Sequence, residues 1–287
     1  MIKSGMLLTV GAVTVAGAMA TGASTAAATT GERLHSQPGV STVNYVALGD
    51  SYSAGLGTGV YDPASGGCSR SPLSYPPLWA SEHHPASFQF VACSGATTGD
   101  VRGSQVAALG PGTDLVTITI GGNDAGFGSV LRTCTVGPSD SACVAAVDTA
   151  EEFARTELPG RLAQTYSAIR NAAPRAHVVV LGYPRLFELT PGCSDPLAPN
   201  LTRRMKLDEG ADVLNSVIYK TVVQQSGFGF VDVRDRFAGH SVCSADPWIN
   251  GPSVPSFIGP YHPNQQGYRD GYLTALDSTS AGDSAAA

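Results

Sequence analysis

Short apolar runs alternate along the chain with segments whose apolar residues recur at helical spacing. Five runs rich in Val, Ile, Phe and Tyr are typical of buried strands, at residues 43–48, 88–92, 115–120, 177–181 and 228–233. Helical patterns lie between and after them, at residues 75–83, 158–169, 207–218 and 264–277. Strands that alternate with helices predict a three-layer α/β/α fold, in which helices cover both faces of one parallel sheet.

Three of the predicted strands end in a short polar turn. The turns read Gly-Asp-Ser at 49–51, Cys-Ser-Gly at 93–95 and Gly-Gly-Asn-Asp at 121–124. Because the carboxyl ends of parallel strands meet at one edge of a sheet, we expect these turns to converge there. This edge is the predicted position of a reactive site.

Ser51 is the candidate nucleophile of that site. A serine on a turn between a strand and a helix exposes its Oγ, and the N–H groups of the helix favour negative charge beside it. The hydroxyl still needs a base to take its proton. Ser53 is a rival that would lie about one turn into the helix, and Asp50 and Ser51 also fit a plain helix cap.

Asn123 and Gly95 are the candidates for binding an oxyanion. A side-chain amide is a neutral donor that keeps its protonation state, and a backbone N–H in a glycine turn offers the same kind of donor. The alternative is that both turns are ordinary connections, since Gly, Asn and Asp are common in turns. In that case Asp124 would cap the helix that follows it.

His262 is the candidate base, because it lies in a late loop from which it can reach across to Ser51. It precedes the last predicted helix, where Pro263 suits the first helical position. His240 is a rival, and a lone histidine is often only structural. An unperturbed histidine has a pKa of about 6.5, so we expect activity to fall as the pH drops through that value.

The composition indicates a single exported domain. The chain has 287 residues, of which 43% are hydrophobic, and this suits one sizeable core. A net charge of −6 gives no basic surface for nucleic acid. Residues 6–20 are apolar but too short for a stable membrane span, so residues 1–28 predict a signal peptide, cleaved after Ala20 or Ala28. A flexible leader at 29–42, a folded domain at 43–277 and a disordered tail at 278–287 complete the prediction, and we expect a secreted monomer.

The six cysteines fit an exported chain. No pair has the Cys-x-x-Cys spacing of a zinc or thioredoxin-type site. An even number favours disulfides, although sequence alone does not select the pairing and buried free thiols are the alternative.

Four short motifs together resemble the blocks of the SGNH (GDSL-type) hydrolase family. They are GDSYS around Ser51, SGAT around Gly95, GGND around Asn123 and HPN around His262, and they occur in this order. The GDSYS and GGNDAGF forms, with the six cysteines, are most similar to secreted actinobacterial lipases and esterases of that family. The resemblance extends over roughly residues 43–276, most of the chain.

The resemblance implies the flavodoxin-like order of a five-stranded parallel sheet. It implies Ser51 as nucleophile, His262 as general base, and an oxyanion hole made by the Ser51 N–H, the Gly95 N–H and the Asn123 side chain. It also implies three disulfides, Cys68–Cys93, Cys134–Cys143 and Cys193–Cys243, and a reaction that needs no metal or organic cofactor.

The chain departs from the family pattern beside the histidine. Many members carry an aspartate three residues before it, where this chain has Gly259. A histidine base still needs its Nδ1–H oriented, and a backbone carbonyl at Gly259 or Pro260 would do this in a Ser–His dyad. Asp246 is the less favoured orienting group.

The substrate is predicted only in outline. Acylglycerol-type carboxylic esters fit the family resemblance and a set of apolar residues in predicted loops, namely Tyr61, Leu73, Trp79, Leu186, Phe187, Trp248, Phe257 and Ile258. Phospholipase A-type activity, carbohydrate acetylesterase activity and a non-catalytic binding module on the same fold are the alternatives.

Overall fold

A computed structural model describes residues 42–255 and 258–283 of the chain. The chain divides between Gly39 and Val40, so all described residues belong to the second unit. Apart from Thr42, the predicted signal peptide and leader lie outside the described residues, as does Phe257.

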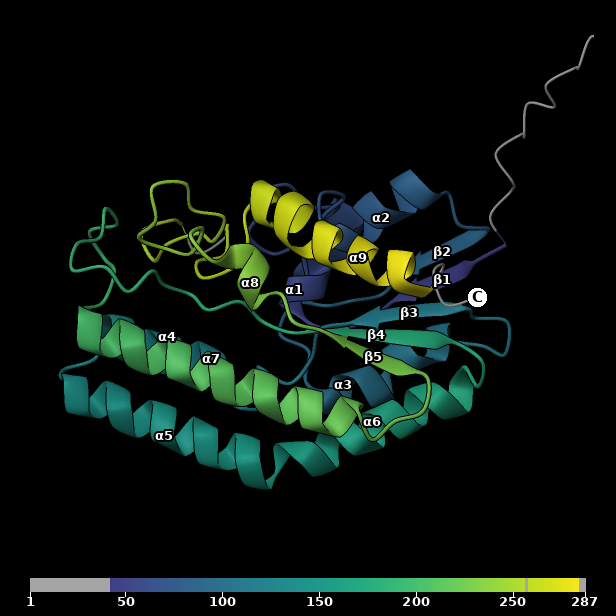
Figure 1. The fold of residues 1–287 in the computed structure, drawn as a ribbon, viewed down its shortest axis with the longest axis horizontal. Helices are drawn as coiled ribbons and strands as arrows, with labels where there is room; N and C mark the ends of the chain where they lie inside the picture. The colour runs from purple at the N-terminus through teal and green to yellow at the C-terminus, as the bar shows by residue number, and fades with distance from the viewer. Residues whose placement is uncertain (1–41, 256–257, 284–287) are drawn as a thin grey trace, which may run out of the picture. The chain divides into compact units, whose positions relative to one another are not determined.

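Five parallel strands form the central sheet in the order β2-β1-β3-β4-β5 (Figure 1). This order is the flavodoxin-like one, which confirms the predicted fold class. Every predicted strand is present, most of them shortened by one or two residues at an end. The strands are β1 Asn44–Ala47, β2 Ser87–Phe90, β3 Leu115–Ile118, β4 His177–Leu181 and β5 Phe228–Val231.

Helices cover both faces of the sheet, which gives the three layers (Figure 1). One face carries α3 Thr98–Gly103, α4 Phe127–Val136, α5 Asp140–Thr156, α6 Leu158–Ala172 and α7 Leu201–Val222. The other carries α2 Tyr75–His83, α8 Arg234–Phe237, the π-helix η3 Gly267–Leu273 and α9 Thr274–Asp283. Two 3₁₀ helices, η1 Pro63–Cys68 and η2 Gln105–Ala108, lie in the connections.

The core lies between these layers, and the central strands are buried on both faces. Val178–Leu181 in β4 are all fully buried, as parallel strands with helices on both sides must be. Within residues 42–255 and 258–283, no helix combines the length and hydropathy that a membrane span requires.

The end of the chain differs from the prediction in two respects. Helix α9 continues to Asp283, so it occupies part of the predicted disordered tail. Its Ser278 and Thr279 hydroxyls donate back to carbonyls three residues earlier, at 2.6 and 2.7 Å, and satisfy acceptors of the helix. Pro263 is not at a first helical position, because it pairs with Ile249 in an isolated bridge and Asn264 caps the helix instead.

Three disulfides join Cys68 to Cys93, Cys134 to Cys143 and Cys193 to Cys243. These are the pairs that the family resemblance implies. The first ties η1 to the turn after β2, and the second ties α4 to α5. Each bond restricts the unfolded chain, an effect worth about 2–4 kcal/mol of stability.

Candidate active site

Ser51 lies at the carboxyl end of β1, at the first position of the short helix α1 (Ser51–Ala54). Backbone hydrogen bonds from Leu48 and Asp50 to β3 and its extension continue past the strand and fix this turn. Gly49 has a φ of +125°, and a Cβ there would lie 2.6 Å from the Thr119 carbonyl oxygen, so only glycine fits. Asp50 caps α1 by accepting from the Tyr52 N–H at 3.0 Å. The cap and the candidate nucleophile are therefore adjacent residues.

His262 is in direct hydrogen-bond contact with Ser51. The Nε2 atom lies 2.7 Å from Ser51 Oγ, and Nδ1 lies 2.9 Å from the Pro260 carbonyl oxygen. Because a carbonyl can only accept, Nδ1 carries the proton and Nε2 has its lone pair directed at the serine hydroxyl. Of the two carbonyls that the sequence offered, Pro260 makes the contact.

The segment that carries His262 is fixed by its surroundings. Tyr261 adopts a φ of 63°, which turns the chain so that the next side chain faces α1. Its carbonyl accepts from the Tyr52 hydroxyl at 2.6 Å. Asn250 exchanges backbone hydrogen bonds with this segment on both sides, at 2.8 and 2.9 Å. A Cβ at Gly57 would lie 2.9 Å from His262 Cβ, so a glycine is needed for this close approach.

Burial lowers the pKa of His262 to about 4, and the hydrogen bond to the Pro260 carbonyl opposes this only in part. The imidazole is therefore neutral at pH 7 and can accept a proton. A pKa of about 6.5 applies to an unperturbed imidazole, and the sequence did not reveal this burial.

The rival residues have structural partners elsewhere. Ser53 is fully buried and its Oγ lies 2.9 Å from the Tyr75 hydroxyl. His240 Nδ1 contacts the Asp246 carbonyl oxygen at 2.9 Å, and its ring stacks on Trp248 with centroids 3.7 Å apart. The carboxylate of Asp246 accepts from Trp248 Nε1 at 3.3 Å and has no contact with His262.

Asn123 lies at the same site as Ser51, whereas Gly95 lies beside it. Asn123 lines a cavity together with Ser51 and His262, and its Nδ2 donates to the Ala96 carbonyl at 2.9 Å. A second N–H of that amide remains for a ligand. Gly95 does not line the cavity. Within the described part of the chain, the N–H groups of Gly95 and Ser51 donate no hydrogen bond, so both remain available to an oxyanion.

The polar turns after β2 and β3 are joined by side chains. Asp124 accepts from the N–H and the hydroxyl of Thr98, at 2.9 and 2.7 Å. It therefore binds the start of α3 rather than capping the helix that follows it in sequence. This contact and the Asn123–Ala96 bond hold the turns after β2 and β3 together, so the predicted convergence is present.

The cavity at Ser51 has a volume of about 70 Å³ and an apolar wall. Phe127 and Leu131 of α4 form this wall, and Asp50, Tyr52 and Tyr183 line it as well. Of the eight apolar loop residues proposed from the sequence, the seven that the structure describes do not line it. Several of those, including Trp79, Leu186 and Phe187, are buried in the core instead. Phe127 is the last residue of the GGNDAGF motif, which is the part of the sequence that could have indicated this apolar wall.

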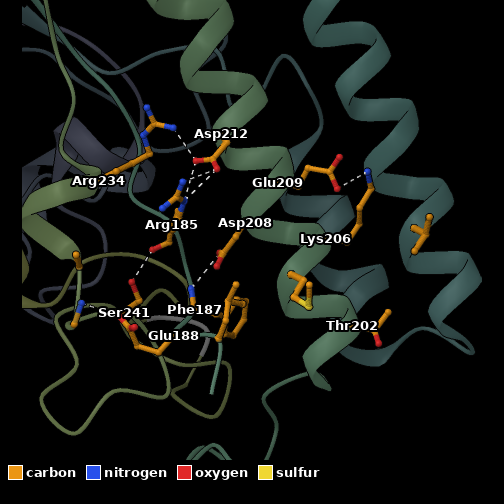
Figure 2. Close-up of a pocket in the computed structure, with 15 residues that line it drawn as sticks. Arg185, Phe187, Glu188, Thr202, Lys206, Asp208, Glu209, Asp212, Arg234 and Ser241 are labelled. Carbon is orange, nitrogen blue, oxygen red and sulfur yellow. Dashed lines mark hydrogen bonds and ion pairs between the residues drawn. The ribbon is translucent and has the colours of Figure 1, made fainter. Parts of the chain in front are cut away.

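A larger cavity of about 980 Å³ lies beside α7 and the segment after β4 (Figure 2). Its cations are paired, since Arg185 and Arg234 both contact Asp212, at 2.8 and 2.7 Å. Burial raises the pKa of Asp208, which also lines it, to about 7. No histidine is among the described residues that line this cavity, and Ser51, Asn123 and His262 line the smaller one instead.

The motifs that form the smaller cavity match a known family over most of the chain. Residues 47–269 match the GDSL-like Lipase/Acylhydrolase family. The chain belongs to this family, and it is a carboxylic ester hydrolase of the lipase/esterase type. This assignment favours an enzyme over the non-catalytic binding module considered above.

Similar proteins come from Streptomyces. The chain is 44% identical over 265 residues to Lipase 1 of Streptomyces coelicolor, a match that covers 92% of this chain and 94% of that protein. It is 46% identical over 243 residues to a lipase of Streptomyces rimosus, covering 85% and 89%.

Two solved structures are similar throughout the described fold. The crystal structure of phospholipase A1 from Streptomyces albidoflavus gives a TM-score of 0.79 at 47% identity, covering 83% of this chain and 99% of that one. The extracellular lipase from Streptomyces rimosus gives 0.78 at 46% identity, with the same coverage.

Proposed function

We propose that Ser51 and His262 hydrolyse carboxylic esters as a dyad through an acyl-enzyme intermediate. His262 Nε2 takes the hydroxyl proton as Ser51 Oγ forms a bond to the ester carbonyl carbon. The bond to the leaving oxygen then breaks, and His262 returns the proton to the departing alcohol. In the second half, a water molecule takes the place of the serine hydroxyl and the acid leaves. The 2.7 Å contact between Oγ and Nε2, with Nδ1 oriented by Pro260, is the observation that carries this proposal.

The carbonyl of Pro260 replaces the carboxylate of a triad in this mechanism. It orients the ring and fixes the tautomer, but as a dipole it stabilises the imidazolium less than a full negative charge would. Among the described residues that line the cavity, Asp50 is the one with an acidic side chain.

Asn123→Ala is expected to lower kcat by about 10²–10³-fold, because the amide would bind the oxyanion more tightly than the ground-state carbonyl. Ser51 and Gly95 would keep their N–H groups, so activity should not vanish. Steady-state kinetics on a soluble p-nitrophenyl ester measure the effect. A loss of less than tenfold, in a variant with an unchanged melting temperature, would remove Asn123 from the oxyanion hole.

Acylglycerol esters are the proposed substrate class. Two relatives at 44–46% identity are named lipases, which supports this class. Phospholipase A-type cleavage is a second candidate, favoured by the similarity to a phospholipase A1. A cavity of about 70 Å³ beside Ser51 is too small for a long acyl chain, so most of such a chain would lie outside it. Rates on p-nitrophenyl esters of increasing length, triacylglycerol, phosphatidylcholine and acetylated xylan separate lipase, phospholipase and carbohydrate esterase activity.

We further propose that the protein acts outside the cell as a monomer. Three disulfides and the apolar leader of residues 6–20 support export, because structural disulfides persist in oxidising compartments. N-terminal sequencing of protein recovered from culture medium would locate the cleavage site. Size-exclusion chromatography with light scattering tests the monomer.

We expect kcat/KM to be lost completely only well below pH 6.5, as the pH approaches the pKa of about 4 for His262. The sign follows from the role, since a base must be deprotonated and burial disfavours its protonated form. Rates measured from pH 3.5 to 8, with circular dichroism as a check on folding, test this. Complete inactivation near pH 6.5 in a folded protein would contradict the buried, neutral imidazole.

A further inference from the structure

A buried carboxylate lies directly before the nucleophile. Asp50 is 2% exposed, and its Oδ1 accepts from the Tyr52 N–H at 3.0 Å and from the Thr119 hydroxyl at 2.7 Å. Its Oδ2 accepts from the Tyr183 hydroxyl at 2.5 Å. Asp50 has no cationic partner among the described residues. The titratable groups that face it are the tyrosines of the surrounding elements and, across the cavity, the histidine: Tyr52, Tyr75, Tyr183, Tyr268, Tyr272 and His262.

Tyr183 joins this carboxylate to the turn that carries Asn123. It follows β4, it is 5% exposed, and its hydroxyl also accepts from the Gly122 N–H at 3.3 Å. Its ring packs edge-on against Tyr52 with centroids 5.0 Å apart, and it lines the cavity at Ser51. One hydroxyl therefore connects the residue before Ser51 with the residue before Asn123.

We propose that Tyr183 is a positioning residue for ester hydrolysis, whose hydroxyl fixes the spacing between the Ser51 nucleophile and the Asn123 amide. This inference rests on the proposed function of those two residues. Tyr183 acts through Asp50 and Gly122 and has no contact with Ser51 Oγ or His262 Nε2. The effect on rate is large because a misplacement of about 1 Å in a catalytic constellation can cost on the order of 10²-fold.

The proposed role depends on the hydroxyl of Tyr183 and not on its ring. A phenylalanine at position 183 would keep the packing on Tyr52 but would leave a buried carboxylate oxygen and a backbone N–H without a partner. The connection also requires an ionised Asp50. A proton on Asp50 would turn one acceptor into a donor, so the two turns would loosen at a pH where His262 is still neutral.

This gives the wild-type profile a second feature. Burial raises the pKa of Asp50 to about 6, although its hydrogen bonds oppose the shift. We expect kcat to fall partially near that pH, as a shoulder above the complete loss that protonation of His262 causes. A variant without the Tyr183 hydroxyl already lacks the connection that protonation of Asp50 would break, so the shoulder should be absent from its profile.

The test compares Tyr183→Phe with Tyr45→Phe. Tyr45 is fully buried and its hydroxyl contacts Thr117 at 2.7 Å, so the control also loses one buried hydroxyl contact but lies outside the cavity. With a p-nitrophenyl ester at pH 8, Tyr183→Phe is expected to lower kcat by about 10–100-fold with KM changed less than about twofold. Tyr45→Phe is expected to lower the melting temperature while kcat stays near the wild-type value.

A double-mutant cycle with Asp50→Asn separates positioning from general destabilisation. If the two side chains act through one contact, the double variant is no slower than the slower single variant. Should Tyr183→Phe not fold, Asp50→Asn alone must lower kcat and abolish the shoulder near pH 6. The proposal is overturned by a kcat for Tyr183→Phe within about twofold of that for Tyr45→Phe, by additive effects in the cycle, or by a shoulder that Asp50→Asn leaves in place.

Ser51→Ala, measured in the same series, keeps the two proposals apart. An active Ser51→Ala would reject the proposed function itself. An inactive Ser51→Ala together with a normal Tyr183→Phe would reject only the role of Tyr183.

Discussion

Ser51→Ala is expected to lower kcat/KM by about 10⁴-fold or more, without a change in fold. The substitution removes the proposed attacking atom, and among the described residues no other hydroxyl hydrogen bonds to His262. The free enzyme should lose little stability, because Ser51 Oγ hydrogen bonds only to the histidine ring in the part of the chain that the structure describes. A fluorophosphonate probe measures the same loss as an absence of covalent label.

Ser53→Ala is the matched control for this variant. Its hydroxyl bonds to Tyr75 and Thr119 in the core, so its loss should lower the melting temperature while the label still reaches Ser51. Peptide mapping of the labelled protein identifies the modified serine. A stoichiometric label on folded Ser51→Ala would show that the nucleophile lies elsewhere.

His262→Ala is expected to cause a loss of similar size, and the double variant Ser51→Ala/His262→Ala should be no worse than either single one. The two residues would act as a unit, since the serine is unreactive without its base and the base has no acyl-enzyme to hydrolyse without the serine. Measured kcat values for the three variants test this non-additivity.

His240→Ala is the control for the histidine. Its ring stacks on Trp248 and contacts Asp246 on the surface, so its removal should change tryptophan fluorescence more than activity. If His240→Ala abolished turnover and His262→Ala did not, the base would have been misassigned.

The strands and the helices α6 and α7 were predictable because their apolar residues follow the right period. Helix α2 has the predicted bounds, and α6 begins at Leu158, where the predicted helical pattern begins. Helices α4 and α5 were not predicted. The buried face of α5 is made by Cys143, Val147, Glu151 and Ala154, which recur at helical spacing, but only Val147 among them is a large aliphatic residue.

The site was predictable where a motif named a residue and was not where distant elements supply the environment. The polar turns after β1 and β3 indicated Ser51 and Asn123, and the loop position indicated His262. The role of Tyr183 had no such signal, because the turn after β4 reads only Gly-Tyr and contains no ionisable group near neutral pH. The lowered pKa of His262 depends on burial by Tyr52 and its neighbours, which only the folded chain brings together.

The histidine of this enzyme takes its orientation from the main chain, at the Pro260 carbonyl. Every amino acid has that oxygen, so no single codon change can delete it, and an alanine scan would pass over position 260 without revealing its importance. Natural variation is therefore free to alter this side chain as long as the loop keeps its path. Selection should act on the shape of residues 259–262, and at position 260 insertions or deletions should be tolerated far less well than substitutions.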